Sequence, residues 1–241
     1  MRWVVLALVG LTLTGCETTA EKSARLEHQA KLAAAREHRT QKLNTFTGQS
    51  THVKVLGATL LRGSEGAAAV VTLRNTSPHA LRAVPIAITV SDSAGRQLFQ
   101  NSAAGSEAAL VSVASIPAHG ELVWVDDQIP ANGSPAAVSA RVGEASAASG
   151  PIPETSVSGL HVIEDPTNGL GAAGTVTNHS HVAQHALVVF IVAVRGGRPI
   201  AAARAVLPEL AGGASLPFQA FFVGDPHGGT LHASAPASST G

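Results

Sequence analysis

Short runs of alternating apolar and polar residues, separated by turn residues, fill the chain from residue 52 onward. In the clearest run, Leu81–Ser91, every second residue from Val84 to Val90 is a branched aliphatic residue. A period of two places these side chains on one face of a strand. We expect similar strands at residues 52–61, 66–74, 97–100, 108–116, 121–126 and 138–142. Regularly spaced short strands predict a mainly β fold, an antiparallel β-sandwich.

The same order of features occurs a second time. Asn75-Thr76-Ser77 has a counterpart in Asn178-His179-Ser180, and a long apolar strand follows each of them. A glycine turn follows 20 residues after Asn75, at Gly95, and 19 residues after Asn178, at Gly197. Strands of the second copy are expected at residues 157–162, 171–178, 186–195, 215–223 and 230–234. This order predicts a duplicated module, the alternative being two unrelated sandwiches rich in valine and alanine.

A stretch rich in Gly, Ala, Ser and Pro at residues 143–153 separates the two copies and is typical of a linker. We therefore predict β-sandwich domains at residues 49–145 and 155–235, joined by a linker at 146–154. A disordered tail is expected at residues 236–241. Both domains have ordinary sizes.

Thr72–Asn75 with Val84–Gly95, and Thr175–Asn178 with Leu187–Gly197, share a strand ending in asparagine, a loop, and a valine-rich strand closing in a glycine turn. In this they resemble the small immunoglobulin-like FxLyD-type modules of bacterial lipoproteins. Of the aromatic and acidic residues that give that family its name, only Asp92 is present. The resemblance implies two tandem antiparallel Ig-like β-sandwich domains. It says little about function, because sandwiches host many unrelated roles.

The N-terminus has the features of an export signal. Arg2 precedes an apolar segment of 11 residues, Trp3–Leu13, which is too short to span a membrane as a helix. The segment ends in Leu13-Thr14-Gly15-Cys16, which resembles a bacterial lipobox. The resemblance implies cleavage of a signal peptide at residues 1–15, and acylation of Cys16 with diacylglycerol and palmitate-type chains. Two or more chains anchor a protein stably to a membrane.

The predicted location is the extracytoplasmic side of the cell membrane or the outer membrane, reached through the lipid on Cys16. The alternative is an ordinary cleaved signal followed by a cysteine that is buried in the core. Cys16 is the only cysteine in the chain, so no internal disulfide can form.

Residues 16–48 are predicted to form the lipid anchor and a helical stalk. Residues 17–43 contain no Gly or Pro and many strong helix formers. Glu21–Arg25 and Glu27–Lys31 are i,i+4 pairs in the favourable orientation. A helix over Glu21–Leu43 would be about 35 Å long. The alternatives are a partner-binding helix and a solvated helix without a partner.

Histidines are the best candidates for chemistry. His179, His181 and His185 fall within seven residues, with His161 on the preceding strand, and imidazoles are good ligands for Zn, Cu or Ni. The cluster is therefore a candidate metal site, the alternative being a polar loop whose histidines face water.

The other patterns do not favour catalysis. No Gly-x-Ser-x-Gly elbow and no phosphate-binding loop occurs in the sequence. The adjacent Asp126 and Asp127 would point to opposite faces of a strand, and we expect both to end that strand in solvent. We accordingly predict no enzyme and no cofactor. Without the leader the chain has 15 basic and 16 acidic residues, a balance that gives no electrostatic footprint for nucleic acid, and we predict no nucleic-acid partner.

The aromatic residues suggest where a partner could bind. Trp124 shares a strand face with Leu122 and is expected in the core. Phe221 and Phe222 are adjacent, so one of them could be exposed for a partner, the alternative being that both faces of the strand are covered. The predicted function is a non-enzymatic binding or scaffolding role toward an envelope protein or cell-wall partner. The alternatives are a metal-binding lipoprotein that uses the histidine cluster, and an enzyme with dispersed catalytic residues.

Overall fold

The structure is a computed structural model that describes residues 48–64, 66–102 and 107–238. These residues are mainly β-strand, and the helix among them is one 3-10 turn, η1 (Ala108–Leu110). The strands of the first part are β1 (Val53–Arg62), β2 (Gly66–Asn75), β3 (Leu81–Ser91), β4 (Gln97–Gln100), β5 (Ser112–Ile116), β6 (Glu121–Pro130), β7 (Ala137–Val142) and β8 (Ser146–Ala147). Those of the second part are β9 (Thr155–Asp165), β10 (Gly169–Asn178), β11 (Gln184–Arg195), β12 (Arg198–Leu210), β13 (Ser215–Phe221), β14 (Val223–Gly224) and β15 (Thr230–Ser234).

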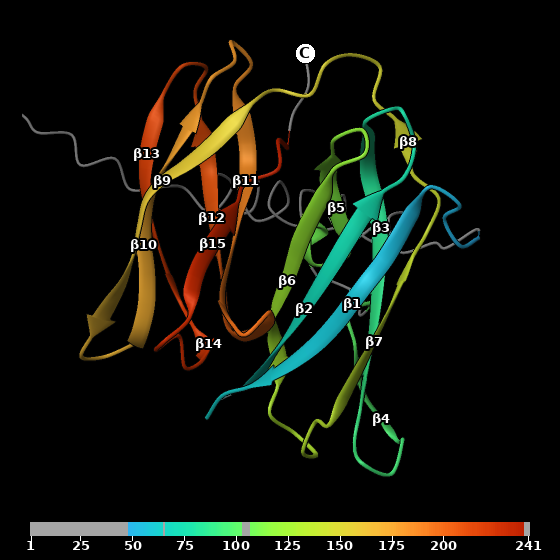
Figure 1. Ribbon diagram of the computed structural model, residues 1–241, viewed down its shortest axis with the longest axis vertical. Coiled ribbons are helices and arrows are strands. Elements are labelled where there is room, and N and C mark those ends of the chain that lie inside the picture. Colours follow the sequence, from blue (N-terminus) through green and yellow to red (C-terminus); the bar gives the residue numbers. More distant parts are fainter. Residues whose placement is uncertain (1–47, 65, 103–106, 239–241) are drawn as a thin grey trace, which may run out of the picture.

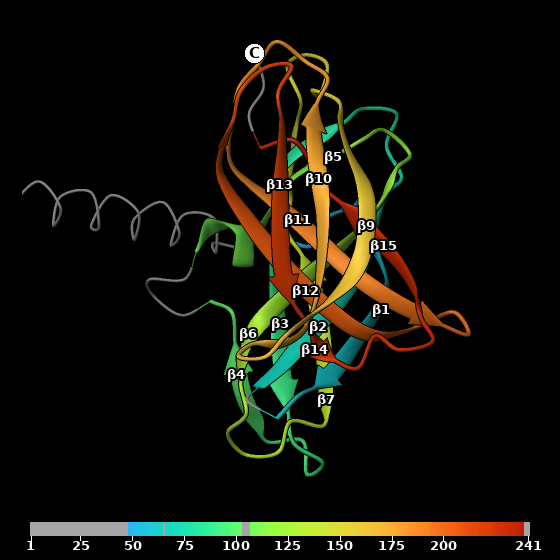
Figure 2. The same ribbon diagram turned by 90° about the vertical axis from the view of Figure 1, so that its left-hand side faces the viewer.

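The described strands form four antiparallel sheets in a β-sandwich-like architecture. The sheet β1-β2-β6 and the sheet of β3 with β4, β5, β7 and β8 make up what we call the first sheet pair. The sheets β13-β10-β9 and β14-β12-β11-β15 make up the second sheet pair. Figure 1 shows the four sheets as successive layers, with β1-β2-β6 next to β14-β12-β11-β15. In Figure 2 the outer sheet β13-β10-β9 faces the viewer.

The two sheet pairs share most of their strand pairings. β2 lies between β1 and β6, as β10 lies between β9 and β13. β3 pairs with β4, β5 and β7, and β11 correspondingly pairs with β12 and β15. Even a rare backbone conformation is repeated: Ala83 and Ala186 both have φ of 48°, and each follows the asparagine of its own copy by eight residues.

The main difference between the sheet pairs is β12, which sequence patterning missed. It is one continuous strand of 13 residues along β11, where the first sheet pair has two shorter strands, β4 and β5. Alanine is a weak strand former, and Pro199 and Pro208 stand near its ends, so its local sequence does not indicate a strand. Pairing with the apolar β11 overrides that weak propensity.

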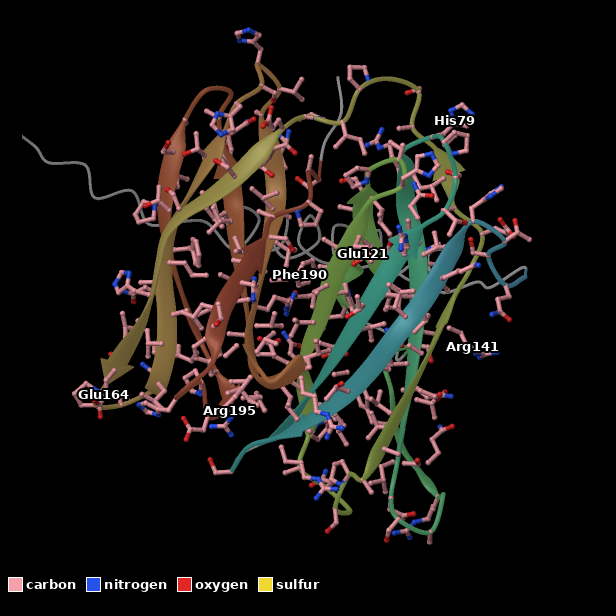
Figure 3. The ribbon with its side chains drawn as sticks, viewed as in Figure 1. His79, Glu121, Arg141, Glu164, Phe190 and Arg195 are labelled. Carbon is pink, nitrogen blue, oxygen red and sulfur yellow. The ribbon has the colours of Figure 1, made fainter. Side chains whose placement is uncertain are left out.

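β11 explains why the two inner sheets stack. Its residues are apolar without interruption from Ala186 to Val194. One face of β11 packs into the hydrophobic core of the second sheet pair through Leu187, Val189 and Ile191. The other face packs into the hydrophobic core of the first sheet pair through Val188, Phe190 and Val192. A strand that is apolar on both faces needs cover on both. Figure 3 accordingly places Phe190 on the side of β11 that faces β6.

The predicted linker and tail are more ordered than their composition indicates. Ser146–Ala147, placed in the linker, form β8 and pair with Leu81 and Arg82 of β3. In the tail, Ala237 is buried between the sheet pairs: its carbonyl oxygen accepts a hydrogen bond of 2.9 Å from Ser115 Oγ. The disorder predicted for residues 236–241 therefore does not apply to 236–238. Small residues can be ordered by burial that composition does not reveal.

The predicted signal peptide, Cys16 and the stalk up to residue 47 lie outside the described residues. Within residues 48–238, the described segments contain no helix of the length and apolarity that crossing a membrane requires.

Candidate functional site

The histidines predicted to bind metal do not converge. His179, His181 and His185 are all exposed, and no group of three His, Cys, Asp or Glu side chains in the described segments is arranged to hold a metal ion. His179 instead contacts the hydroxyl of Ser156, with 2.7 Å between Nε2 and Oγ. His161 similarly contacts the carbonyl oxygen of Gly159 on its own strand. Close spacing in the sequence therefore does not bring these imidazoles to a common point.

The Asn-x-Ser motifs that marked the repeat are buried structural turns. Asn75 Nδ2 donates to the carbonyl oxygens of His79 at 2.8 Å and Pro117 at 2.9 Å, with a longer contact to Ile116 at 3.4 Å. Its Oδ1 accepts from both the backbone N–H and the hydroxyl of Ser77, each at 2.9 Å. One side chain thus ties the β2–β3 loop to the turn between β5 and β6.

Asn178 makes the corresponding set of bonds in the second sheet pair. Its Nδ2 donates to Val182 at 2.9 Å and Ala211 at 3.1 Å, with a longer contact to Leu210 at 3.4 Å. Its Oδ1 accepts from the N–H and hydroxyl of Ser180 at 3.1 and 2.7 Å. Both asparagines are fully buried. The motif therefore has the same structural role twice.

The charged residues that the structure does bring together lie where the two sheet pairs meet. Arg204 of β12 projects toward the first sheet pair, and its side chain is only 4% exposed. Its Nε donates to Asp127 Oδ1 at 3.2 Å, and its Nη1 donates to Glu107 Oε2 at 2.9 Å. We call these three residues the Arg204 clamp. One guanidinium of the second sheet pair thus binds two carboxylates of the first.

Asp126, next to the clamp, is the most unusual ionisable group among the described residues. The prediction that Asp126 and Asp127 end a strand in solvent is wrong, because β6 continues to Pro130 and Asp126 is fully buried. Gln128 N–H donates to its Oδ1 at 3.0 Å, while Oδ2 has no hydrogen-bond partner in the described part of the chain. Burial raises the pKa of Asp126 to about 6, and the neighbouring Asp127 adds to the rise.

Trp124 and Asp126 are two residues apart on β6, where they pair with Val71 and Ala69 of β2. Their side chains therefore lie on the same face of the strand. The prediction that Trp124 belongs to the core is confirmed, since its side chain is fully buried. Its Nε1 donates to the carbonyl oxygen of Ala109 in η1 at 3.0 Å. Glu107, the residue just before η1, belongs to the clamp. The segment 107–110 therefore contacts both the core of the first sheet pair and Arg204.

The C-terminal segment crosses the same junction at another place. Thr155 Oγ1 donates to the carbonyl oxygen of Ala235, and Ser238 N–H donates to the buried Gln184 Oε1 at 2.8 Å. Together with the bond from Ser115 to Ala237, these contacts fasten residues 235–238 to both sheet pairs. Phe222, one candidate for a partner surface, instead packs against the core of the second sheet pair, and Phe221 is half-buried.

Sequence reasoning missed Arg204 and Glu107. Arg204 is a single charge within an alanine-rich run whose strand was not predicted, and Glu107 lies far from it in sequence. The one available signal was Arg204 itself, since an isolated arginine between apolar residues requires a buried partner. Its partners follow only from the stacking of the sheets.

No protein-family model matches the chain, and the comparison with curated proteins gives no match. Similar solved structures include the Amycolatopsis orientalis exo-chitosanase CsxA, which covers 74% of this chain at 11% identity and a TM-score of 0.27. Red sea bream transglutaminase covers 78% at 13% identity and a TM-score of 0.24. The chain spans 25% and 29% of the lengths of these two proteins. Likenesses this distant carry no argument about activity.

Proposed function

We propose that this protein is an exported, lipid-anchored lipoprotein with a non-enzymatic binding or scaffolding role in the bacterial cell envelope. The observation that carries the proposal is the leader, in which Arg2 and a short apolar segment end at Leu13-Thr14-Gly15-Cys16. Acyl chains on Cys16 hold the chain at the membrane, and the stalk predicted within residues 16–48 raises the sheet pairs above it.

The proposal includes two tandem Ig-like domains that arose by duplication. It is supported by the matching strand pairings, by the paired positive φ angles at Ala83 and Ala186, and by the equivalent hydrogen bonds of Asn75 and Asn178. Unrelated β-sandwiches also alternate apolar and polar residues along their strands. A buried asparagine that makes the same five hydrogen-bond contacts in each copy is a more specific likeness.

A binding role is supported by how the buried polar side chains are used. Asn75, Asn178 and Gln184 bond to loops and to the C-terminal segment, and Arg204 holds the sheet pairs together. These groups stabilise the fold and fix its shape. In the proposed role, the surfaces and strand edges of this fixed framework would hold an envelope protein or a cell-wall polymer.

The test of the anchor is the Cys16→Ser variant, expressed in the bacterial host with labelled palmitate. The parent should incorporate label and partition into the detergent phase of a Triton X-114 separation, because its acyl chains prefer the micelle. The variant should lose the label and move to the aqueous phase. A variant that still partitions fully into detergent would contradict the proposed anchor.

A further inference from the structure

We propose that Asp126 is a proton-dependent switch that controls how firmly the segment 107–110 is attached, and through Glu107 controls the Arg204 clamp between the two sheet pairs. The inference goes beyond the proposed envelope role. It concerns a conformational device within the fold and does not depend on the lipid anchor.

The geometry gives the first part of the argument. Asp126 is fully buried and one of its two carboxyl oxygens has no partner among the described residues. It shares a face of β6 with Trp124, whose indole N–H is bonded to η1 at Ala109. A neutral carboxyl is tolerated in such a place, whereas a carboxylate requires water or a counter-ion.

The charges around Asp126 give the second part. Its neighbours on β6 and in segment 107–110, Asp127 and Glu107, are acidic, and Arg204 from β12 is the cation. On β2 it faces Ala69, and β5 (Ser112–Ile116) carries no ionisable side chain. Arg204 already bonds to both other carboxylates. An ionised Asp126 would therefore be repelled by two carboxylates, while the nearby cation is already bonded to both of them.

The direction of the switch follows from the pKa. In the unfolded chain Asp126 has an ordinary pKa near 3.8, and burial raises it to about 6 in the folded protein. The folded state therefore binds the proton more tightly, so the stabilising contribution is present at low pH and is lost as the pH rises through about 6. Above that pH, hydration of the carboxylate favours opening of segment 107–110, which releases Glu107 from Arg204.

Tryptophan fluorescence tests the switch, because Trp124 is bonded to the segment that should move. The chain has two tryptophans, and a Trp3→Phe variant of the full chain leaves Trp124 alone. We expect acrylamide to quench Trp124 about two-fold more efficiently at about pH 8 than at about pH 5, with a midpoint near 6. Equal quenching at both pH values would overturn the proposal.

Two substitutions test whether Asp126 itself causes the transition. Asp126→Asn, in the Trp3→Phe background, should keep quenching low at every pH; a variant that retains the transition would refute the assignment. Asp127→Asn should move the midpoint to lower pH, because Asp127 raises the pKa of Asp126 and its loss frees Arg204. If Asp126→Asn does not fold, the midpoint of Asp127→Asn tests whether Asp126 is the titrating group. A midpoint in Asp127→Asn that is unchanged or higher than in the parent overturns the proposal.

A third substitution tests the link to the clamp. Glu107→Gln removes one ion pair of Arg204 and leaves Asp126 intact. We expect Trp124 in this variant to be quenched more than in the parent already at about pH 5, because the segment has lost its attachment to β12. Quenching equal to that of the parent at this pH would show that Glu107 does not hold the segment.

Discussion

Replacing Arg204 with alanine should lower the free energy of unfolding by about 3 kcal/mol, because the loss of one partner leaves buried charge unpaired. Asp127 has only 17% of its side chain exposed, so solvent compensates it poorly. Glu107 is 55% exposed and can be solvated, so we expect the lower end of the range for buried ion pairs. Urea unfolding followed by Trp124 fluorescence would measure the loss.

The matched control is Arg96→Ala. Arg96 Nε also bonds to a carboxylate, Asp92 Oδ2, at 3.1 Å, but 74% of its side chain is exposed. Exposed pairs contribute little because water and salt screen them. We therefore expect Arg204→Ala to unfold at a clearly lower urea concentration than Arg96→Ala. Similar midpoints for the two variants would mean that the clamp does not stabilise the junction.

Asn75→Ala and Asn178→Ala should each lower the free energy of unfolding by about 3 kcal/mol or more, because buried carbonyl oxygens lose their donor. Asn75 is bonded to Pro117 and His79, and Asn178 to Ala211 and Val182. The buried contact between the sheet pairs further predicts that both variants shift one common unfolding transition. Differential scanning calorimetry would measure both effects.

Asn132→Ala is the control, because Asn132 lies in an exposed turn and should change stability by no more than about 0.5 kcal/mol. Two resolved transitions, with each asparagine variant affecting a different one, would show that the sheet pairs unfold separately. A cost close to that of the control would mean that the buried amide bonds contribute little.

The sequence predicted those parts of the fold that local pattern determines. β3 and β15 have the predicted bounds, because strict alternation or adjacent turns mark their ends. β12 was missed because its strand character comes from pairing with β11. The predicted β6 was too short, because two adjacent aspartates were expected to lie in solvent. In the structure Asp126 and Asp127 are each covered, on opposite faces of the sheet.

The candidate site was harder to predict, because it depends on contacts between residues far apart in the sequence. Glu107 and Arg204 are 97 residues apart and meet only because β11 and β12 stack on β6. The histidines gave the stronger local signal and turned out to be exposed and dispersed. Cys16, on which the proposed function depends, lies outside the described residues, so its lipidation stays a prediction from the sequence.

The double burial of β11 leaves its alignment with its neighbours weakly determined by hydrophobicity. In an ordinary strand a slip of one residue exposes the apolar face, which strongly penalises the slip. On β11 such a slip would exchange one apolar face for another. Other features therefore fix the register: the turn Gly196-Gly197 joins β11 directly to β12, and at the polar start of the strand Gln184 accepts from Ser238 and donates to Val182. A tight turn at one end and the C-terminal segment at the other thus hold the strand that both cores share.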